Sequence, residues 1–279
     1  MNSSATVIIT AHEQAETLCL VLLALARQTV KPDEVVVADD GSGGGVAAAV
    51  AALAGELPFR LLHIWQPHEE FRAARSRNTA IHHSRGRLVA FLDQDALPLA
   101  GWLERHAAAG GQGRVAIGQM IRLPVDGPPV TREEVRSGRL EARFSEPLRA
   151  AAAALHRRYA RYAWLRGAGL PIKSKPKLIS CDFSASREDL LAVNGFDEEY
   201  VGWGQEDDDL GRRLYAAGVQ PVVVVRDAPV LHIPHPVRHA ADWGAGANAA
   251  RFARRDLPVR CVRGLSDHPH PDVRVTELR

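Results

Sequence analysis

The stretch EVVVADDGSG, residues 34–43, is the most informative part of the chain for the fold. Its valines follow one another without the alternating polar residues of a strand that has one solvated face. This predicts a strand over 34–38 that is buried on both sides, as in a parallel sheet covered by helices. The Asp-Asp-Gly-Ser turn that follows then places two carboxylates at the carboxyl end of that strand.

The segments on either side of this stretch alternate between strand and helix patterns. Further strands are expected at 6–10, 59–64, 88–92 and 115–122, and helices at 13–28, 47–54, 72–83 and 102–109. This alternation is typical of a parallel α/β sheet. Ligands of such open sheets bind beyond the carboxyl ends of the strands, which makes the acidic loops Asp39-Asp40 and Asp93-Gln94-Asp95 candidate site residues.

The second half of the chain differs in character. Residues 124–177 are rich in Arg and Lys, with one or two Ala-rich helices over 140–165, and we interpret them as a basic helical insertion between an α/β part (1–123) and its continuation (178–236). The insertion is either a solvated basic face or a contact for an acidic partner such as phosphate, a lipid head group or an anionic acceptor. Residues 237–279 form a tail without a clear pattern. Other expected elements are strands at 178–184 and 221–225 and helices at 187–193 and 208–217.

Composition narrows the class of protein. The chain has 279 residues, 46% of them hydrophobic, and a formal net charge of +2, which is ordinary for a globular protein and gives no reason to expect a nucleic-acid partner. Its three cysteines are widely separated and are expected to be reduced thiols. Without a signal-peptide pattern or a long apolar run, a cytoplasmic protein is expected, and the abundance of Ala, Arg and Gly suggests a GC-rich bacterial source.

The segment GWGQEDDDL, residues 202–210, has the composition of an active site. Four adjacent carboxylates repel one another, so they must be solvated, lie at a helix N-terminus, or engage a substrate or cation. A solvated acidic turn would explain the charges but not the Gly-Trp-Gly that precedes them. Glycines let the backbone approach a ligand, and the indole of Trp203 offers a flat face for a sugar ring.

Two further groups carry possible ligand chemistry. Asp93 and Asp95 supply the oxygen ligands that hard divalent cations prefer, although a lone Asp-x-Asp is common in surface loops. His232 follows the last expected strand and could complete a metal site, with His235 as the alternative. A single histidine is more often an ordinary core or surface residue.

Two motifs could bind a nucleotide. The turn at Asp39 and Asp40 could hold a base or ribose, or be a plain hairpin-like turn. Arg77, within Arg75-Ser76-Arg77-Asn78, could pair with a diphosphate or form surface salt bridges with local acids.

These motifs, in this order, resemble the GT-A family 2 nucleotide-sugar glycosyltransferases. The resemblance rests on VIITAHE (7–13), VVVADDGS (35–42), Arg77-Asn78 and AFLDQD (90–95). The segments NGFDE (194–198) and GWGQEDDDL (202–210) are similar to the C-terminal part of β-1,4-galactosyltransferases and of chondroitin-polymerase-type bacterial enzymes. The similarity covers roughly residues 5–123 and 178–236 and leaves out the insertion and the tail.

The resemblance implies a GT-A fold, mainly a parallel Rossmann-like sheet with helices on both faces, in which 1–123 binds the nucleotide sugar and 178–236 binds the acceptor. It implies inverting transfer from a UDP-sugar to a hydroxyl of a glycan, lipid-linked saccharide or small molecule in polysaccharide biosynthesis, with Mn²⁺ or Mg²⁺ as cofactor. The implied donor-side residues are Thr10, His12, Asp40 or Asp39 at the uridine, Arg77 at the diphosphate, Asp95 and His232 at the metal, and Asp93 at ribose or metal. The implied acceptor-side residues are Asp207 as catalytic base, Glu206 at the acceptor hydroxyl and Trp203 against the sugar.

Two positions depart from the family pattern, because His12 and Asp182 stand where Asn is common. Two other functions remain open: a nucleotidyltransferase, which would release pyrophosphate but lacks a Gly-rich, Lys-containing loop here, and a non-catalytic carbohydrate-binding protein. The basic insertion could also dock at the inner face of a membrane near a lipid-linked acceptor. Donor sugar, acceptor, linkage and oligomeric state are not encoded in any motif we identify.

Overall fold

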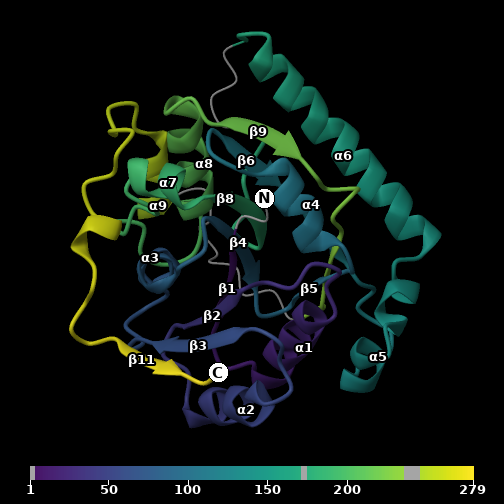
Figure 1. Ribbon diagram of the computed structural model, residues 1–279. Helices are drawn as coiled ribbons and strands as arrows, with labels where there is room; N and C mark the ends of the chain where they lie inside the picture. The colour runs from purple at the N-terminus through teal and green to yellow at the C-terminus, as the bar shows by residue number, and fades with distance from the viewer. Residues whose placement is uncertain (1–3, 171–174, 236–245) are drawn as a thin grey trace.

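The computed structural model describes residues 4–170, 175–235 and 246–279, and a large central sheet organises them (Figure 1). Its strands are β1 (Ala5–Ala11), β2 (Glu34–Asp39), β3 (Arg60–Trp65), β4 (Leu88–Asp93), β6 (Arg114–Ile117), β8 (Asp182–Ser186), β9 (Gln220–Val223) and β11 (Arg274–Glu277). They lie in the order β11-β3-β2-β1-β4-β8-β6-β9. A small second sheet has the order β5-β10-β7, from β5 (Ala96–Pro98), β10 (Val230–His232) and β7 (Met120–Arg122).

Most of the central sheet is parallel, as the sequence predicted. β1 pairs in parallel with β2 and β4, β2 with β3, and β6 with β9. The exceptions are β8, which is antiparallel to both β4 and β6, and β11, which is antiparallel to β3. The central sheet is therefore interrupted by the antiparallel strand β8 near one edge, and the antiparallel C-terminal strand β11 forms the other edge.

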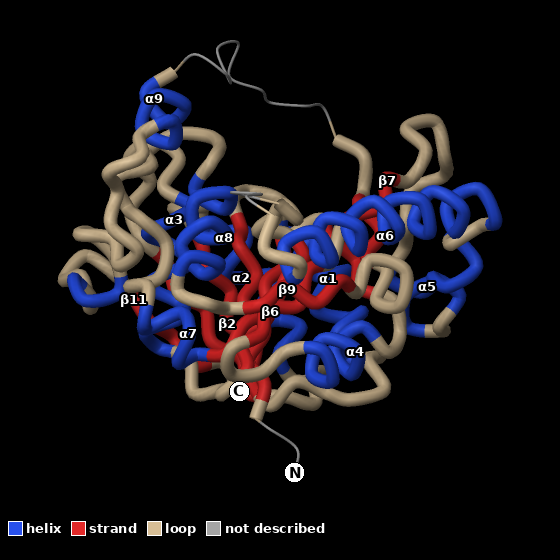
Figure 2. The backbone as a smooth tube through the Cα atoms, turned by 90° about the horizontal axis from the view of Figure 1, so that it is seen from above, coloured by secondary structure: helices blue, strands red, loops and turns tan. Residues whose placement is uncertain are grey.

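Helices cover both faces of this sheet (Figure 2). The helices are α1 (Ala15–Ala26), α2 (Gly44–Ala54), α3 (Ala73–His83), α4 (Trp102–Ala109), α5 (Arg132–Arg136), α6 (Glu146–Gly167), α7 (Arg187–Ala192), α8 (Glu206–Ala216) and α9 (Ala247–Ala253), with 3-10 turns η1 (Arg139–Arg143) and η2 (Leu265–Asp267). Seen from above, α3 and α7 lie on one side of the strands and α4 and α5 on the other.

Alternate residues of each strand feed two separate cores. Val35 and Val37 of β2 face the core formed with α1 and α2, whereas Val36 and Ala38 face the core formed with α3 and α8. Because both faces are covered, the strand needs apolar residues at every position, which explains the uninterrupted valine run.

Three expected element boundaries were wrong. The single strand expected at 115–122 is split into β6 and β7, which belong to different sheets. The break includes Gly118, where an added Cβ would come within 2.0 Å of the Asp182 carboxylate, so a residue with a side chain does not fit there. The strand expected from residue 178 begins only at Asp182, and the helix expected from 208 already begins at Glu206.

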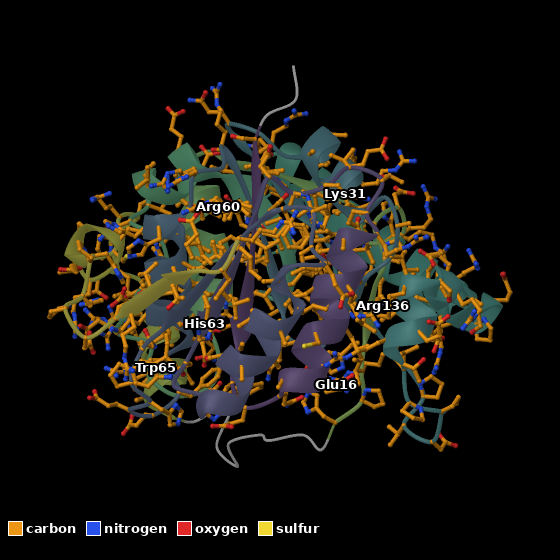
Figure 3. The ribbon with its side chains drawn as sticks, turned by 60° about the horizontal axis from the view of Figure 1, so that its bottom comes forward. Glu16, Lys31, Arg60, His63, Trp65 and Arg136 are labelled. Atoms are coloured by element: carbon orange, nitrogen blue, oxygen red, sulfur yellow. The ribbon has the colours of Figure 1, made fainter. Side chains whose placement is uncertain are left out.

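The basic insertion packs against the α/β body. Val135, Leu140 and Phe144 join the core on the α1 side of the sheet, and Arg136 forms an ion pair of 2.7 Å with Glu56 (Figure 3 labels Arg136 beside α1). The long helix α6 contacts β9 and β7. Domain boundaries at 123, 177 and 236 remain a prediction.

The C-terminal residues have more structure than the sequence indicated. β11 pairs with β3, and the ion pair between Arg60 and Glu277 links these strands across 2.8 Å. Arg274 lies over the ring of Trp65, a residue labelled in Figure 3. The first part of the expected tail, residues 237–245, lies outside the described residues. Within the described ranges, none of the helices combines the length and apolar character that a membrane crossing requires.

Candidate active site

The carboxyl ends of β1, β2 and β4 lie side by side and bring the expected donor residues together. The strand register aligns Ala11 with Asp39 on one side and Thr10 with Asp93 on the other. Because parallel strands end at the same edge of a sheet, motifs 80 residues apart in sequence meet here. The sequence predicted this convergence from the strand pattern.

Arg77 occupies the centre of the site. It lies on α3, its side chain is buried, and its guanidinium donates to Glu206 Oε1 (3.0 Å), Asp93 Oδ1 (3.2 Å) and Thr10 Oγ1 (3.1 Å). Burial alone would lower the pKa of Arg77, but the charges of Asp93 and Glu206 outweigh it and the pKa is raised. Arg77 therefore joins the donor-side loop to the start of α8.

A possible metal centre lies next to this arginine. Asp95, His232 and His235 place one ligand atom each within 4.8 Å of one another. His232 Nε2 is 3.6 Å from Asp95 Oδ1, and His235 Nε2 is 3.1 Å from Asp95 Oδ2. The two histidines that the sequence offered as alternatives thus converge together. Asp93, expected at ribose or metal, is outside this group and contacts Arg77.

The protonation of this cluster suits a cation. Burial, followed by the charge of Asp93, raises the pKa of Asp95 to about 6. Near neutral pH this side chain is therefore mainly an anionic carboxylate, and the groups around it do not fully balance its charge. Burial, followed by His235, lowers the pKa of His232 to about 4, which leaves a neutral imidazole with a lone pair. An anionic oxygen and neutral imidazole nitrogens are donors that divalent metal ions accept.

The acidic run begins α8 and lies in its first turn. Three of its four carboxylates form ion pairs: Glu206 with Arg77, Asp208 with Lys177 at 2.8 Å, and Asp209 with Arg213 at 2.6 Å. The sequence reading assigned Asp208 and Asp209 to the helix N-terminus. They do lie there, but each is also held by a basic side chain.

Asp207 is the remaining carboxylate of the run. In the described part of the chain it forms no ion pair, and it accepts hydrogen bonds only from the backbone N–H groups of Asp208 (2.7 Å) and Ser180 (3.3 Å). Burial, followed by the charges of Glu206 and Asp208, raises its pKa to about 7. A carboxylate with this pKa can accept a proton near neutral pH.

An exposed indole lies beside these carboxylates. Trp203 is 41% exposed, between Gly202 with φ +81° and Gly204 with φ +99°. These left-handed conformations disfavour residues with a Cβ, which explains the flanking glycines. The Gly202 N–H donates to the carbonyl of Phe71, so the exposed rings of Phe71 and Trp203 belong to neighbouring loops.

The two candidate uridine residues are both buried and both hydrogen-bonded. Asp39 accepts from Ser42 N and contacts His63 Nε2 at 2.8 Å. Asp40 accepts from Gln66 Nε2 (2.6 Å) and from the N–H of Arg72 (3.2 Å).

A pair of stacked histidines lies directly beside this turn. The rings of His12 and His68 have centroids 4.6 Å apart, and each places Nδ1 3.0 Å from the Asp40 carbonyl oxygen. Sequence reasoning missed His68 and Gln66. Their signal was position, because they follow β3, the parallel neighbour of β2.

Asp182, one of the two departures from the family pattern, faces the protein interior. It is fully buried, and its Oδ1 accepts from Trp102 Nε1 at 2.9 Å and lies 3.1 Å from His106 Nε2. The carboxylate therefore belongs to a buried polar network between α4 and β8.

Comparison with known proteins identifies the family of the chain. A family profile described as "Glycosyl transferase family 2" matches residues 6–164, and one described as "N-terminal domain of galactosyltransferase" matches residues 171–236. The chain is 29% identical over 272 residues to validoxylamine A glucosyltransferase from Streptomyces hygroscopicus subsp. limoneus, covering 89% of this chain and 56% of that protein. It is 38% identical over 69 residues to mouse β-1,4-galactosyltransferase 1, covering 25% of this chain and 16% of that protein. The chain thus spans little more than half the length of this glucosyltransferase.

Solved structures support the fold. A mannosyltransferase from Pyrobaculum calidifontis in complex with GDP-Man and Mn²⁺ superposes with a TM-score of 0.58 at 18% identity, covering 87% of this chain and 60% of that one. GalNAc-T7 with UDP, GalNAc and Mn²⁺ gives a TM-score of 0.59 at 13% identity, covering 90% and 47%. The expected GT-A fold is confirmed.

Proposed function

Since the chain belongs to glycosyl transferase family 2, we propose that it transfers a sugar from a nucleoside diphosphate to an acceptor hydroxyl with inversion at the anomeric carbon. Direct displacement needs a base on the incoming hydroxyl and positive charge on the leaving diphosphate. The site offers both, with Asp207 on the α8 side and Asp95, His232 and His235 on the strand side. The sugar would lie between them.

The observation that carries this proposal is the division of charge around Arg77. Its guanidinium pairs with Asp93 on one side and Glu206 on the other. Each paired carboxylate has a neighbour, Asp95 or Asp207, whose pKa is raised. Asp95 lies among imidazoles that can share a cation, and Asp207 follows the exposed Trp203 closely in the chain.

On the donor side, Mn²⁺ or Mg²⁺ would be held by Asp95 and His232, with His235 as a further ligand. A donor set of one carboxylate and imidazoles suits such a cation. Bound there, the cation would supply charge neutralisation to the diphosphate. The Asp39-Asp40 turn with Thr10 and His12 would receive the nucleoside, which we infer to be uridine from the family pattern.

On the acceptor side, Asp207 would take the proton of the hydroxyl that attacks. Glu206, which resemblance placed at the acceptor, is bound to Arg77, so we assign it a role in fixing that guanidinium as well. Trp203 would stack on the acceptor sugar. An acceptor with a saccharide or cyclitol-like ring matches this flat, exposed indole.

The deciding experiment incubates the protein with an array of UDP- and GDP-sugars, with Mn²⁺, Mg²⁺ or EDTA, and a panel of saccharide acceptors. Metal-dependent release of nucleoside diphosphate, with an inverted product by NMR, supports the proposal. Release of pyrophosphate from a sugar phosphate and a nucleoside triphosphate would instead identify a nucleotidyltransferase. Sugar binding that EDTA does not affect, without affinity for any nucleotide, would identify a carbohydrate-binding protein.

We further propose that the basic insertion contacts an anionic membrane surface at its inner, cytoplasmic side. The exposed face of α6 carries Arg157, Arg158 and Arg161, and Trp164 near its end is 69% exposed. Basic residues followed by an exposed indole suit the interface of an anionic bilayer. Flotation with phosphatidylglycerol vesicles, but not with phosphatidylcholine vesicles, is expected, and Arg157→Glu with Arg161→Glu should abolish it. Equal flotation of this double variant would contradict membrane contact through α6.

A further inference from the structure

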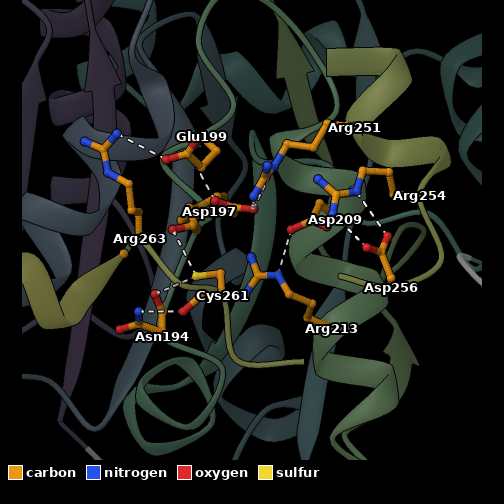
Figure 4. A network of polar contacts seen from close by, with 12 residues as sticks. Asn194, Asp197, Glu199, Asp209, Arg213, Arg251, Arg254, Asp256, Cys261 and Arg263 are labelled. Carbon is orange, nitrogen blue, oxygen red and sulfur yellow. Dashed lines mark hydrogen bonds and ion pairs between the residues drawn. The ribbon is translucent and has the colours of Figure 1, made fainter. Parts of the chain in front are cut away.

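A second cluster of metal-binding side chains lies where the C-terminal residues meet the loop after α7. The loop residues Asp197, Glu198 and Glu199 all contact later parts of the chain. Asp197 pairs with Arg251 at 2.7 Å and Glu199 with Arg263 at 3.2 Å, both seen in Figure 4. Glu198, between them, faces histidines instead. These contacts attach the C-terminal segment to the body beside α3.

The histidines that Glu198 faces are His268 and His270. The three residues place one ligand atom each within 4.8 Å of one another. His268 Nε2 is 2.7 Å from Glu198 Oε1, and His270 Nε2 is 3.5 Å from Glu198 Oε2. The side chain of His268 is completely buried. His270 Nε2 is also shielded from solvent and makes no hydrogen bond.

His268 has polar contacts at both ring nitrogens. The hydroxyl of Thr79 donates to the carbonyl of Arg75 at 2.9 Å and lies 3.3 Å from His268 Nδ1, so its oxygen can accept a proton from that nitrogen. In the tautomer with the proton on Nδ1, Nε2 has a lone pair that points at Glu198 Oε1. Two acceptors at 2.7 Å repel each other unless a proton or a cation binds both.

A second acceptor aims at the same place. His270 Nε2 is shielded from solvent, makes no hydrogen bond and lies 3.5 Å from Glu198 Oε2. A single proton on His268 would satisfy only one contact. A metal ion beside the carboxylate would satisfy both nitrogens and the oxygen, while Thr79 would hold the outer nitrogen of His268, as second-sphere groups commonly do.

We propose that Glu198, His268 and His270 bind a divalent transition-metal ion of the Zn²⁺ class, separate from the Asp95 cluster. Two imidazoles and one carboxylate form a donor set that Zn²⁺ accepts, and water or a ligand completes the fourth position. The ion fastens the C-terminal segment to the body. This inference does not depend on the proposed transferase activity.

The second site is connected to the first through one side chain. Asn78 Nδ2 donates to Glu198 Oε1 at 2.8 Å and to the Phe196 carbonyl at 2.8 Å. Asn78 follows Arg77 on α3, so an ion at Glu198 holds the turn of the helix that presents this arginine. Loss of the ion is therefore expected to loosen the C-terminal segment first and α3 second.

The test measures Zn²⁺ binding in full-length, tag-free protein treated with a chelator. Asp95→Asn combined with His232→Ala removes the first cluster, so that among the described residues the proposed site is the remaining group of converging ligands. Competition with a chromophoric zinc indicator is expected to show one bound Zn²⁺ in this background. His270→Gln in the same background should weaken binding at least 100-fold. Zn²⁺ should raise the Tm of the background protein but not that of the His270→Gln form.

Two controls make the result decisive. His156→Gln, on α6, removes a histidine remote in sequence from the cluster and should leave Zn²⁺ affinity unchanged. His270 is at the edge of the cluster, so its replacement is less disruptive than that of the buried His268. Absence of Zn²⁺ binding in the background protein would overturn the proposal and show that a proton on His268 bridges the pair. Unchanged affinity in His270→Gln would overturn it equally. Either result leaves the transferase proposal untouched, because that depends on Asp95 and Asp207.

Discussion

Asp95 and Asp207 lie on opposite sides of Arg77 in closely similar electrostatic settings. Each neighbours a carboxylate that pairs with the arginine, Asp93 in one case and Glu206 in the other. Asp95 is buried and Asp207 is half-buried, and removal from water together with acidic neighbours raises both pKa values, to about 6 for Asp95 and about 7 for Asp207. Arg77 thus pairs with Asp93 on one side and with Glu206 on the other, whereas Asp95 and Asp207 form no ion pair with it.

The surroundings of the two carboxylates then differ. Two imidazoles converge on Asp95, whereas the described contacts of Asp207 are backbone N–H groups. A carboxylate beside imidazoles can balance its charge by sharing a cation with them. A carboxylate without imidazole neighbours can instead accept a proton. Under the proposed function, the same raised pKa would suit a metal ligand in one place and a general base in the other.

The largest effect is expected from Asp207→Asn. The amide keeps the shape of the side chain but cannot accept the acceptor proton, so kcat should fall by about 10²- to 10⁴-fold. Initial-rate measurements of nucleoside diphosphate release test this, with donor affinity measured by calorimetry expected to remain unchanged. Asp208→Asn, which alters the adjacent carboxylate bound to Lys177, is the matched control and should cost far less. Equal losses of kcat in the two variants would contradict the assignment of Asp207 as the base.

Removal of the cation should have the next largest effect. EDTA, or Asp95→Asn, is expected to lower kcat/KM by about 100-fold, because a metal ion supplies several kcal/mol of charge stabilisation. Raising the Mn²⁺ concentration should partly restore the Asp95→Asn variant. Asp93→Asn removes a carboxylate outside the converging ligand group and should leave the apparent Mn²⁺ affinity within about threefold of the wild type. If Asp93→Asn weakened Mn²⁺ as strongly as Asp95→Asn, the assignment of ligands would be wrong.

At saturating metal concentration, kcat/KM should fall at acidic pH, and the pKa of Asp207 should set where the fall begins. The base acts only when deprotonated, and its raised pKa of about 7 means that protons compete for it below neutrality. kcat/KM should therefore fall by about tenfold for each pH unit below 7 and level off above it. With limiting Mn²⁺ the fall should steepen, because Asp95 also becomes protonated near pH 6. If kcat/KM did not change between pH 5.5 and 8, the protonation of neither Asp95 nor Asp207 would control the rate.

The smallest effect concerns the acceptor side alone. Trp203→Ala should raise the acceptor KM by about fivefold, equivalent to about 1 kcal/mol, and leave the donor KM unchanged. Trp164→Ala on α6 removes another exposed indole and serves as the control in assays without membranes. A change in donor KM with no change in acceptor KM would contradict the assignment of Trp203 to the acceptor side of the site.

The comparison also shows how far sequence patterns reach. The acids at 39–40, 93, 95 and 206–207 were predicted as site residues because buried strands or a Gly-Trp-Gly motif precede them. Their pairings were not identified. Arg77 was assigned to the diphosphate, and nothing in its local sequence indicates that it would bridge Asp93 to Glu206, 129 residues away along the chain.

Other misses share that cause. The apparently continuous strand is divided between two sheets around Gly118, where Asp182 of β8, a strand distant in sequence, occupies the space of a Cβ. Gln66 and His68 enter the nucleoside side of the site through the sheet order, and His268 and His270 reach Glu198 through the path of the C-terminal segment. Each depends on which segments become neighbours, and local hydrophobic periodicity carries no information about that.

The sequence by itself determined the strand and helix pattern, the sheet edge at which ligands bind, and the acids that gather there. These follow from local rules, since a run of valines needs cover on both faces and parallel strands end at one edge. Only the tertiary structure decided which acids are neutralised and which keep a raised pKa. Charge interactions depend on distances and burial in space, and the burial of Arg77 between two loops fixes both at once.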